Sequence, residues 1–212
     1  MRREDIAQVT EIDREAFPTL SPSANYGREL ENQLAHYIVA CDEEGIVDET
    51  EVEASLEKDP SGLASRVRRL FNHSRFFGQE LLESGKQYIT GFTGFWIMAG
   101  EAHITSIAVR EIRRRQGIGE LLLISVIDLA NRLNAHVVTL EVRVSNTVAQ
   151  SLYYKYGFTQ TGLRRNYYIE DREDAVIMST ENITSASFQA RLQRLKQAHS
   201  GKWGIALYQI AR

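Results

Sequence analysis

The feature that most constrains this chain is an uninterrupted strand, basic turn and helix pattern. Ile104–Val109 (ITSIAV) is a strand-like run, and Arg113–Gly119 (RRRQGIG) follows it closely. Apolar residues then recur at the spacing of one helix face: Leu122, Val126, Leu129, Ala130 and Leu133. The start of a helix leaves several backbone N–H groups unpaired, and glycines at 117 and 119 let the backbone approach a ligand closely. The pattern therefore predicts an anion site suited to a pyrophosphate.

Taken alone, this motif also fits a simpler interpretation, a tight turn with a solvated basic face, because short motifs often match by chance. Two commoner phosphate loops are excluded. The chain has no G-x-x-x-x-G-K-[ST], and Leu122 occupies the place of the third glycine of G-x-G-x-x-G. The rest of the sequence has to decide between the two interpretations.

Composition sets the frame for that decision. A chain of 212 residues, 43% hydrophobic and 25% charged, can bury one sizeable core, so we expect one domain with appendages. A net charge of -3 gives no reason to expect nucleic-acid binding. The single cysteine, Cys41, excludes an internal disulfide and fits a reducing compartment. No apolar run is long enough to span a membrane, and the start MRREDI lacks a signal-peptide core. We therefore expect a cytoplasmic protein that binds neither nucleic acid nor membrane.

Hydrophobic periodicity and turn residues divide the remaining chain into elements. They predict helices over 4–17, 27–34 and 146–156, and strands over 36–41, 88–98, 137–143, 158–163 and 175–179, besides the strand ending at Val109. The helix over 146–156 takes Ser145 or Asn146 as N-cap and Gly157 beyond its end. Two further helices are predicted inside an acidic insertion of about 45–86. The tail from 181 contains a polar helix with a narrow apolar stripe at Phe188, Leu192 and Leu195.

Six motifs follow one another between Ile104 and Met178: ITSIAV, RRQGIG, LEVRVSN, LYYKYGF, RRNYY and REDAVIM. In these motifs and their order the chain resembles the GCN5-related N-acetyltransferase (GNAT) superfamily. Within it, LEVRVSN and RRNYY resemble the bacterial RimI-like ribosomal-protein-alanine N-acetyltransferases. The resemblance implies an α/β fold, the GNAT fold, with a mixed central sheet splayed at the acetyl-CoA site. The GNAT domain would cover 1–180, with the helical insertion inside it and a helical extension over 181–212.

The resemblance also implies which residues hold acetyl-CoA. The backbone of Ile107, Ala108 and Val109 would pair with the pantetheine arm as an extra strand does. The turn would hold the pyrophosphate, and it comprises Arg115, Gln116, Gly117, Ile118, Gly119 and Glu120. Asn146, at the start of the following helix, would contact the cofactor.

Acetyl transfer to an amine needs a neutral amine and a proton for the departing thiolate. An α-amino group has a pKa of about 8, against about 10.4 for lysine, so a modest base is sufficient at a protein N-terminus. Glu141, on a strand expected to be buried, is the candidate base, directly or through a water. Its alternative role is an ion pair with Arg143 or another arginine. Tyr153 is the candidate acid, and its alternative role is that of a core aromatic with a satisfied hydroxyl.

Tyr167 and Tyr168 are expected in a loop between the last two strands. In the family such a tyrosine pair belongs to the wall that binds the acceptor peptide, and an ordinary aromatic loop is the alternative. Glu173 and Asp174 either attract a basic peptide or pair with Arg164 and Arg165. The acceptor pocket should also use the loop over 17–26.

No metal site is predicted, because the five histidines are scattered without a ligand motif. A serine or cysteine nucleophile is also unsupported. The expected function is acetyl-CoA-dependent acetylation of a protein N-terminus, in the RimI-like case a ribosomal protein beginning with alanine. Acetylation of a lysine or small amine is one alternative, and a degenerate acyl-CoA-binding or scaffolding protein is another. Three departures from the family are expected. The strand that usually precedes the first helix is shortened or lost. An insertion of about 40 residues follows the strand over 36–41 and is expected to flank the cofactor rim. The tail beyond Thr180 either packs back on the domain or mediates self-association, which the sequence does not decide. The oligomeric state is not predicted.

Overall fold

The computed structural model describes residues 1–18, 24–42 and 87–204. The chain divides into two units, Met1–Cys41 with Ile89–Arg212, and Asp42–Tyr88. The helices that the sequence predicts within 45–86, and the predicted position of that insertion, lie outside the described residues. So does most of the loop predicted between the first two helices.

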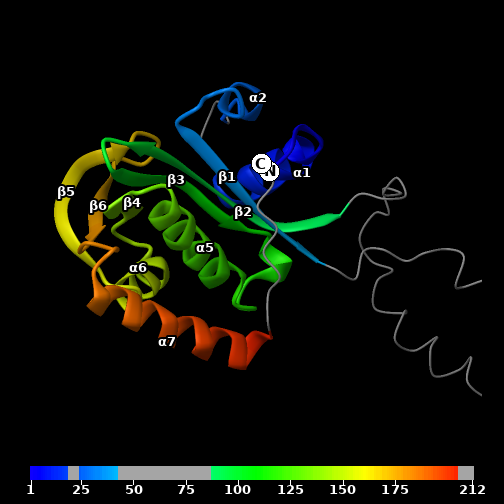
Figure 1. Cartoon of the computed structure of the whole chain (residues 1–212). Helices are drawn as coiled ribbons and strands as arrows, with labels where there is room; N and C mark the ends of the chain where they lie inside the picture. The colour runs from blue at the N-terminus through cyan, green and yellow to red at the C-terminus, as the bar shows by residue number, and fades with distance from the viewer. Residues whose placement is uncertain (19–23, 43–86, 205–212) are drawn as a thin grey trace, which may run out of the picture. The chain divides into compact units, whose positions relative to one another are not determined.

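Helices and strands in the described residues follow the predicted order (Figure 1). They are η1 (Arg3–Asp5), α1 (Ile6–Ala16), α2 (Tyr26–Glu29), β1 (Ala35–Asp42), β2 (Tyr88–Met98), β3 (Glu101–Val109), η3 (Glu111–Arg113), α5 (Ile118–Arg132), β4 (Val137–Arg143), α6 (Thr147–Lys155), β5 (Phe158–Tyr168), β6 (Glu173–Thr180) and α7 (Ala186–Trp203). In the described residues no strand precedes α1, as expected. The N-terminal ammonium of Met1 instead donates to the carbonyl of Tyr37 on β1, at 3.2 Å.

One helix is much shorter than predicted. The prediction of a helix over 27–34 is wrong in extent, because α2 is a single turn. Asn25 caps it by accepting the N–H of Arg28 at 3.2 Å. Three residues beyond its end, the side chain of Asn32 accepts the N–H of Leu34 at 3.1 Å. This local bond competes with the helical ladder and turns the chain into β1.

The six strands form one mixed sheet in the order β1-β2-β3-β4-β6-β5. β3 and β4 pair in parallel, but only from Glu101 with Val137 to Ile104 with Leu140. Beyond that point β3 pairs with β2 alone as far as Val109, and β4 pairs with β6 alone as far as Arg143. The sheet therefore opens between its two central strands, which is the splay that the resemblance predicted.

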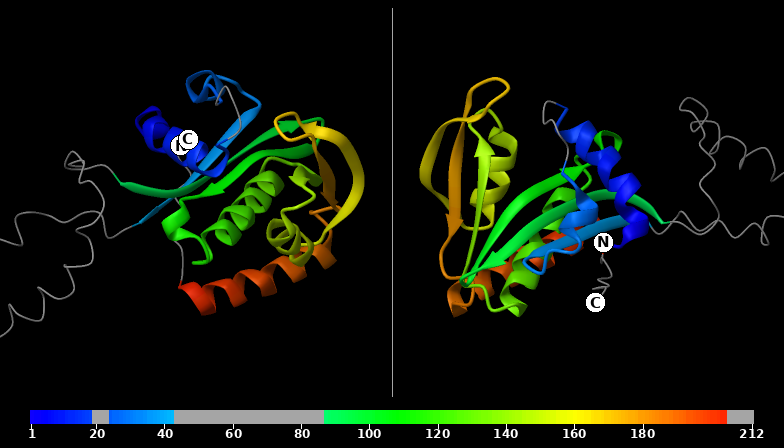
Figure 2. Two further views of the ribbon diagram at one scale, coloured as in Figure 1. Left: turned by 180° about the vertical axis from the view of Figure 1, so that it is seen from behind. Right: turned by 90° about the horizontal axis from the view of Figure 1, so that it is seen from above.

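Helices cover both faces of this sheet (Figures 1 and 2). α1 and α2 pack on one face through a cluster that includes Val9, Ile12, Tyr26 and Phe92. α5, α6 and α7 share the larger cluster, with Leu123, Val126, Tyr156 and Phe188 among its buried members. Of the predicted apolar face of α5, Leu122, Val126 and Ala130 are fully buried, whereas Leu133 at its end is 38% exposed.

The tail helix α7 packs back on the domain. Ser185 caps its start by accepting the N–H of Phe188 at 3.2 Å. Two residues of the predicted stripe, Phe188 and Leu192, are buried in the larger cluster, and the third, Leu195, is partly buried against it. Among the described helices, none is both long and apolar enough to cross a membrane.

Candidate active site

The predicted cofactor strand lies at the open side of the splay. Ile107, Ala108 and Val109 pair with β2 on one side. On the other side, where β4 has diverged, no described strand pairs with them. A strand edge of this kind presents backbone N–H and C=O groups that an amide-bearing ligand can use. The structure thus brings an exposed ladder to the place where the resemblance puts the pantetheine arm.

The predicted phosphate turn connects β3 to α5. Arg115 and Gly117 both have positive φ, of 64° and 78°, so the chain coils tightly before the helix begins at Ile118. Within the described part of the chain, no hydrogen bond engages the N–H groups of residues 117–120. The first helical bond is donated by Leu121 to the carbonyl of Gly117, at 2.9 Å. These free N–H groups, the positive end of the helix dipole and the neighbouring arginines suit a diphosphate.

The side chain of Glu120 does not contribute to this anion site, although the residue belongs to the predicted turn. It accepts from Lys155 Nζ at 2.5 Å and from the Tyr156 hydroxyl at 2.7 Å. Burial alone would raise the pKa of Glu120, but the hydrogen bonds from Lys155 and Tyr156 outweigh burial and lower it. The ionised side chain therefore ties α5 to α6, which leaves the backbone N–H as the part of Glu120 available to an anion.

Asn146 is the N-cap of α6. Its Oδ1 accepts the N–H of Ala149 at 3.1 Å, so the side-chain amide nitrogen is left for other contacts. Tyr153 lies two turns further along the helix and is only 5% exposed. Its ring packs on Phe158 with centroids 5.6 Å apart. Burial, with a smaller effect of Tyr168, raises the pKa of the Tyr153 hydroxyl above its ordinary value. The phenol is consequently protonated across the neutral range.

Glu141 lies on β4 just beyond the last residue that pairs with β3. Its side chain is 7% exposed, with Oε1 at 3.0 Å from Arg164 Nε. The expectation that it pairs with Arg143 or another arginine is correct for Arg164 and wrong for Arg143, which pairs with Asp171 and Glu173 instead. A buried carboxylate with a charged partner is an ion pair and, where a substrate amine comes close, also a proton acceptor.

His103 was not among the residues predicted for the site. Its Nε2 lies 3.1 Å from Glu141 Oε2, and its side chain is 36% exposed. Parallel pairing puts His103 opposite Thr139, on the face that Thr139 shares with Glu141. Only the strand register makes this pair, since the two residues lie far apart in the sequence. ITSIAV does not alternate strictly between polar and apolar residues, so the local sequence contains no signal for this contact of His103.

Tyr167 and Tyr168 are not in a loop, as predicted, but form the end of β5. The strand continues because residues 165–167 bulge out opposite Asp174 alone, and pairing resumes between Tyr168 and Glu173. Asn166, at φ 51°, takes the left-handed conformation of the bulge, and its N–H donates to Asp174 at 2.8 Å. The paired strands hold the two tyrosines more firmly than a loop does.

Tyr168 lies within electrostatic range of both the candidate base, Glu141, and the candidate acid, Tyr153. Its ring meets that of Tyr167 edge to face at 5.2 Å. Burial, offset by Arg143 and reinforced by Tyr167 and Glu141, raises the pKa of Tyr168 to about 12. The pKa of Tyr167 is also raised, by burial and by Glu141. Glu141 thus acts electrostatically on both tyrosines, and Tyr168 acts on Tyr153.

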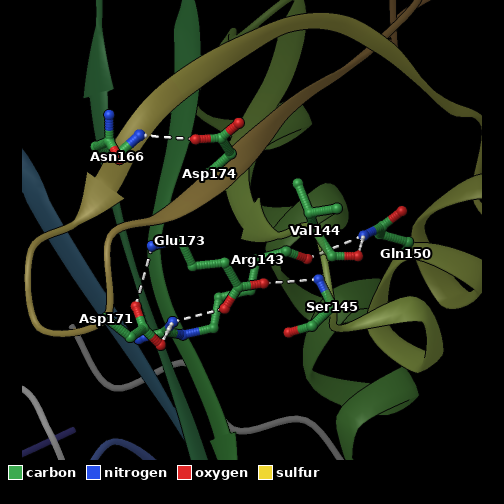
Figure 3. A network of polar contacts seen from close by, with 8 residues as sticks. All are labelled: Arg143, Val144, Ser145, Gln150, Asn166, Asp171, Glu173 and Asp174. Carbon is green, nitrogen blue, oxygen red and sulfur yellow. Dashed lines mark hydrogen bonds and ion pairs between the residues drawn. The ribbon is translucent and has the colours of Figure 1, made fainter.

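A polar network surrounds Arg143 at the end of β4 (Figure 3). Arg143 donates to Asp171 at 2.6 Å and to Glu173 at 2.7 Å, and its guanidinium lies 3.9 Å from the Tyr168 ring centre. Glu173 also accepts the N–H of Ser145, at 2.7 Å. Bonds from Ser145 and Arg143 lower the pKa of Glu173 to about 2. The network joins the end of β4, the start of α6 and the β5–β6 hairpin, and Glu173 therefore has a structural partner other than Arg164 or Arg165.

Metal ligands do not gather anywhere in the described ranges, where no group of three or more His, Cys, Asp or Glu residues could hold an ion. The site instead combines an open strand edge, a glycine turn with free N–H groups, a buried carboxylate and a buried phenol. Together these define the class of acyltransferases that move an acyl group from coenzyme A to an amine. The chain belongs to the Acetyltransferase (GNAT) family, whose sequence profile matches residues 6–158. It is an N-acetyltransferase of the GNAT type.

Individual members of the family are also similar to this chain. The chain is 34% identical over 179 residues to a Bacillus subtilis protein with a provisional assignment as a ribosomal protein bS18-alanine N-acetyltransferase, covering 84% of this chain and 90% of that protein. It is 37% identical over 107 residues to the ribosomal protein bS18-alanine N-acetyltransferase of Escherichia coli K12, covering 50% and 71%. A solved chimaera of spermidine N-acetyltransferase SpeG from Vibrio cholerae and hSSAT shares the fold, with a TM-score of 0.57 at 14% identity over 92% of this chain and 96% of that one.

Proposed function

We propose that this enzyme transfers acetyl from acetyl-CoA to the N-terminal α-amine of a protein, and that its acceptor is a ribosomal protein beginning with alanine. The observation that carries the α-amine is the position of Glu141, which is buried just beyond the point where β4 leaves β3 and acts electrostatically on Tyr167 and Tyr168. The names of the Bacillus and Escherichia relatives support the ribosomal acceptor. A ribosomal substrate fits a cytoplasmic enzyme.

The cofactor would be held by backbone groups in the main. The free edge of Ile107–Val109 would pair with the pantetheine amides, and the N–H groups of residues 117–120 would donate to the diphosphate oxygens. Asn146 would add a side-chain amide. Bound there, acetyl-CoA supplies a thioester carbonyl that a neutral amine attacks directly.

Glu141 would take the proton of the acceptor ammonium on Oε2, directly or through a water. His103 Nε2 lies 3.1 Å from this oxygen, and its side chain is more exposed than that of Glu141. Arg164 pairs with the other oxygen, Oε1, and so fixes the orientation of the carboxylate. Tyr153 would give its hydroxyl proton to the departing sulfur, for which its raised pKa keeps the proton in place.

Tyr167 and Tyr168 would form the wall that orients the first residues of the acceptor. Tyr167 is 43% exposed and can hydrogen-bond a peptide, whereas Tyr168 is held by Arg143 and cannot move freely. Strand pairing holds Tyr168 opposite Glu173, and Tyr167 lies beside it in the bulge, in edge-to-face contact with its ring.

A panel of acceptors tests the proposal. Peptides with a free N-terminal alanine should be acetylated, and the same peptides with a blocked α-amine and a free lysine should not. Preference for the lysine side chain, or for polyamines, would indicate the alternative amine acetyltransferase. Binding of CoA without turnover on any amine would indicate a degenerate binding or scaffolding protein.

A further inference from the structure

The C-terminal helix α7 reaches the phosphate turn at its far end (Figures 1 and 2). His199 Nε2 lies 3.0 Å from the carbonyl oxygen of Gly117. The indole of Trp203 lies against the same glycine, since a Cβ added to Gly117 would meet its atoms at 2.7 Å. Two side chains of the tail therefore contact the one residue at which the turn becomes a helix.

The body of α7 is firmly anchored. Phe188 and Leu192 are buried in the core of the domain, where removal of their apolar surface from water stabilises the attachment of the helix. Lys196 pairs with Asp128 of α5 at 2.6 Å. With these contacts behind it, the end of the helix is a fixed support rather than a loose tail.

The bond from His199 fixes the orientation of the Gly117–Ile118 peptide, whose N–H group an anion would use. A carbonyl oxygen can only accept, so Nε2 carries the proton and donates it. His199 is 8% exposed, and the bond satisfies a buried polar group. The carbonyl of Gly117 and the N–H of Ile118 belong to one planar trans peptide, so they point in opposite directions. Holding the carbonyl towards α7 therefore turns the N–H of Ile118 away from α7.

Trp203 packs against the Cα of Gly117, at the start of the same peptide. Gly117 has φ 78°, a conformation that side chains other than glycine rarely adopt, and the indole fills the space that a Cβ would need. At the same time the N–H groups of residues 117–120 have no partner within the described part of the chain. The indole covers one side of the turn and leaves these N–H groups available.

We propose that α7 is part of the cofactor site, with His199 and Trp203 as positioning residues for the Gly117–Ile118 peptide. They keep the turn in the conformation that directs its N–H groups to the diphosphate of CoA. This inference rests on the proposed use of acetyl-CoA at the turn. It assigns a role to a helix that lies beyond the residues matched by the family profile.

Binding of CoA to the full chain, measured calorimetrically without any acceptor, tests the inference. His199→Leu removes one of the two donors to the Gly117 carbonyl and leaves only the N–H of Leu121, so CoA binding should weaken about tenfold. His199→Gln keeps an N–H donor at a similar reach and should recover most of the affinity. Trp203→Ala should weaken binding, and Trp203→Phe should weaken it less. Arg191→Met is the matched control, because it breaks an exposed ion pair between α7 and Glu181 that does not support the end of the helix, and it should leave CoA affinity unchanged.

Dephospho-CoA, which keeps the diphosphate and lacks the 3′-phosphate, should lose the same factor with His199→Leu. A loss seen with CoA alone would mean that His199 contacts the 3′-phosphate, which overturns the positioning role. Equal CoA affinity in wild type, His199→Leu and Trp203→Ala would also overturn it. If His199→Leu does not fold, the His199→Gln and Trp203 variants decide. Failure of the proposed function looks different: CoA binding would respond to the variants as stated while no α-amine peptide is acetylated.

Discussion

Replacing Glu141 with glutamine tests the catalytic assignment most directly. Glutamine keeps the size of the side chain and can still bond to Arg164 or His103, but it cannot accept a proton. A positioned general base contributes about 10²–10⁴ to a rate. We take the lower end of this range for Glu141, because Arg164 and His103 already contact both of its oxygens and an acceptor amine has to share them. We therefore expect E141Q to lower kcat/KM about 100-fold at pH 7.

The pH dependence separates loss of a base from loss of structure. An α-amine with a pKa of about 8 is about one tenth neutral at pH 7 and about nine tenths neutral at pH 9. A variant without a base can use only the neutral fraction, so its rate rises about tenfold over this interval while the wild type changes little. The deficit of E141Q should narrow from about 100-fold at pH 7 to about tenfold at pH 9.

The assay is initial-rate acetylation of an alanine-initiated peptide, followed by release of free CoA. Arg164→Met is the matched control, since it breaks the same ion pair and keeps the carboxylate. It should stay within about fivefold of wild type with the same pH profile, as expected for a pair with an exposed partner. Wild-type activity of E141Q at pH 7 removes Glu141 from the mechanism. A deficit that is constant from pH 7 to pH 9 restricts Glu141 to a structural role.

Three further changes have defined outcomes. Tyr153→Phe keeps the packing on Phe158 and removes the acid, so kcat should fall about 100-fold with little change in KM and CoA affinity, and an unchanged kcat would exclude Tyr153 as the acid. Because the pKa of Tyr153 is raised, the wild type should show no alkaline decline in rate below about pH 10. Glu173→Gln should destabilise the protein at pH 7, and since the folded pKa of about 2 lies below the unfolded value of 4.5, the gap to wild type in urea unfolding should close as pH falls from 4.5 towards 2; a gap independent of pH would contradict the network. Gly117→Ala would force alanine into a positive φ and bring its Cβ against Trp203, so it should cost about 1–3 kcal/mol of stability. Adding Trp203→Ala should recover the loss due to the steric clash but not the loss due to the backbone conformation.

Several parts of the site could be predicted from local sequence alone. The period of α5, the glycines before it and the cap at Asn146 depend on residues within one or two turns of each other, and the structure confirms the elements that they predict. β4 and its isolated carboxylate were predicted for the same reason, because alternation along one strand assigns a face to each residue. Family motifs added the order of these elements and the splay.

The contacts that complete the site depend on which strands pair and in which register. His103 meets Glu141 because β3 and β4 pair in parallel for four residues before they diverge, and no local pattern encodes that register. Tyr168 meets Arg143 only because a bulge prolongs β5, where the sequence favoured a loop. The tail helix was predicted from its own apolar stripe, but its position over Gly117 follows from where the core accepts Phe188 and Leu192. The sequence by itself determined the elements, the anion turn and the candidate acid and base. The tertiary structure decided their partners, because contacts between residues distant along the chain are set by packing and strand register rather than by local pattern.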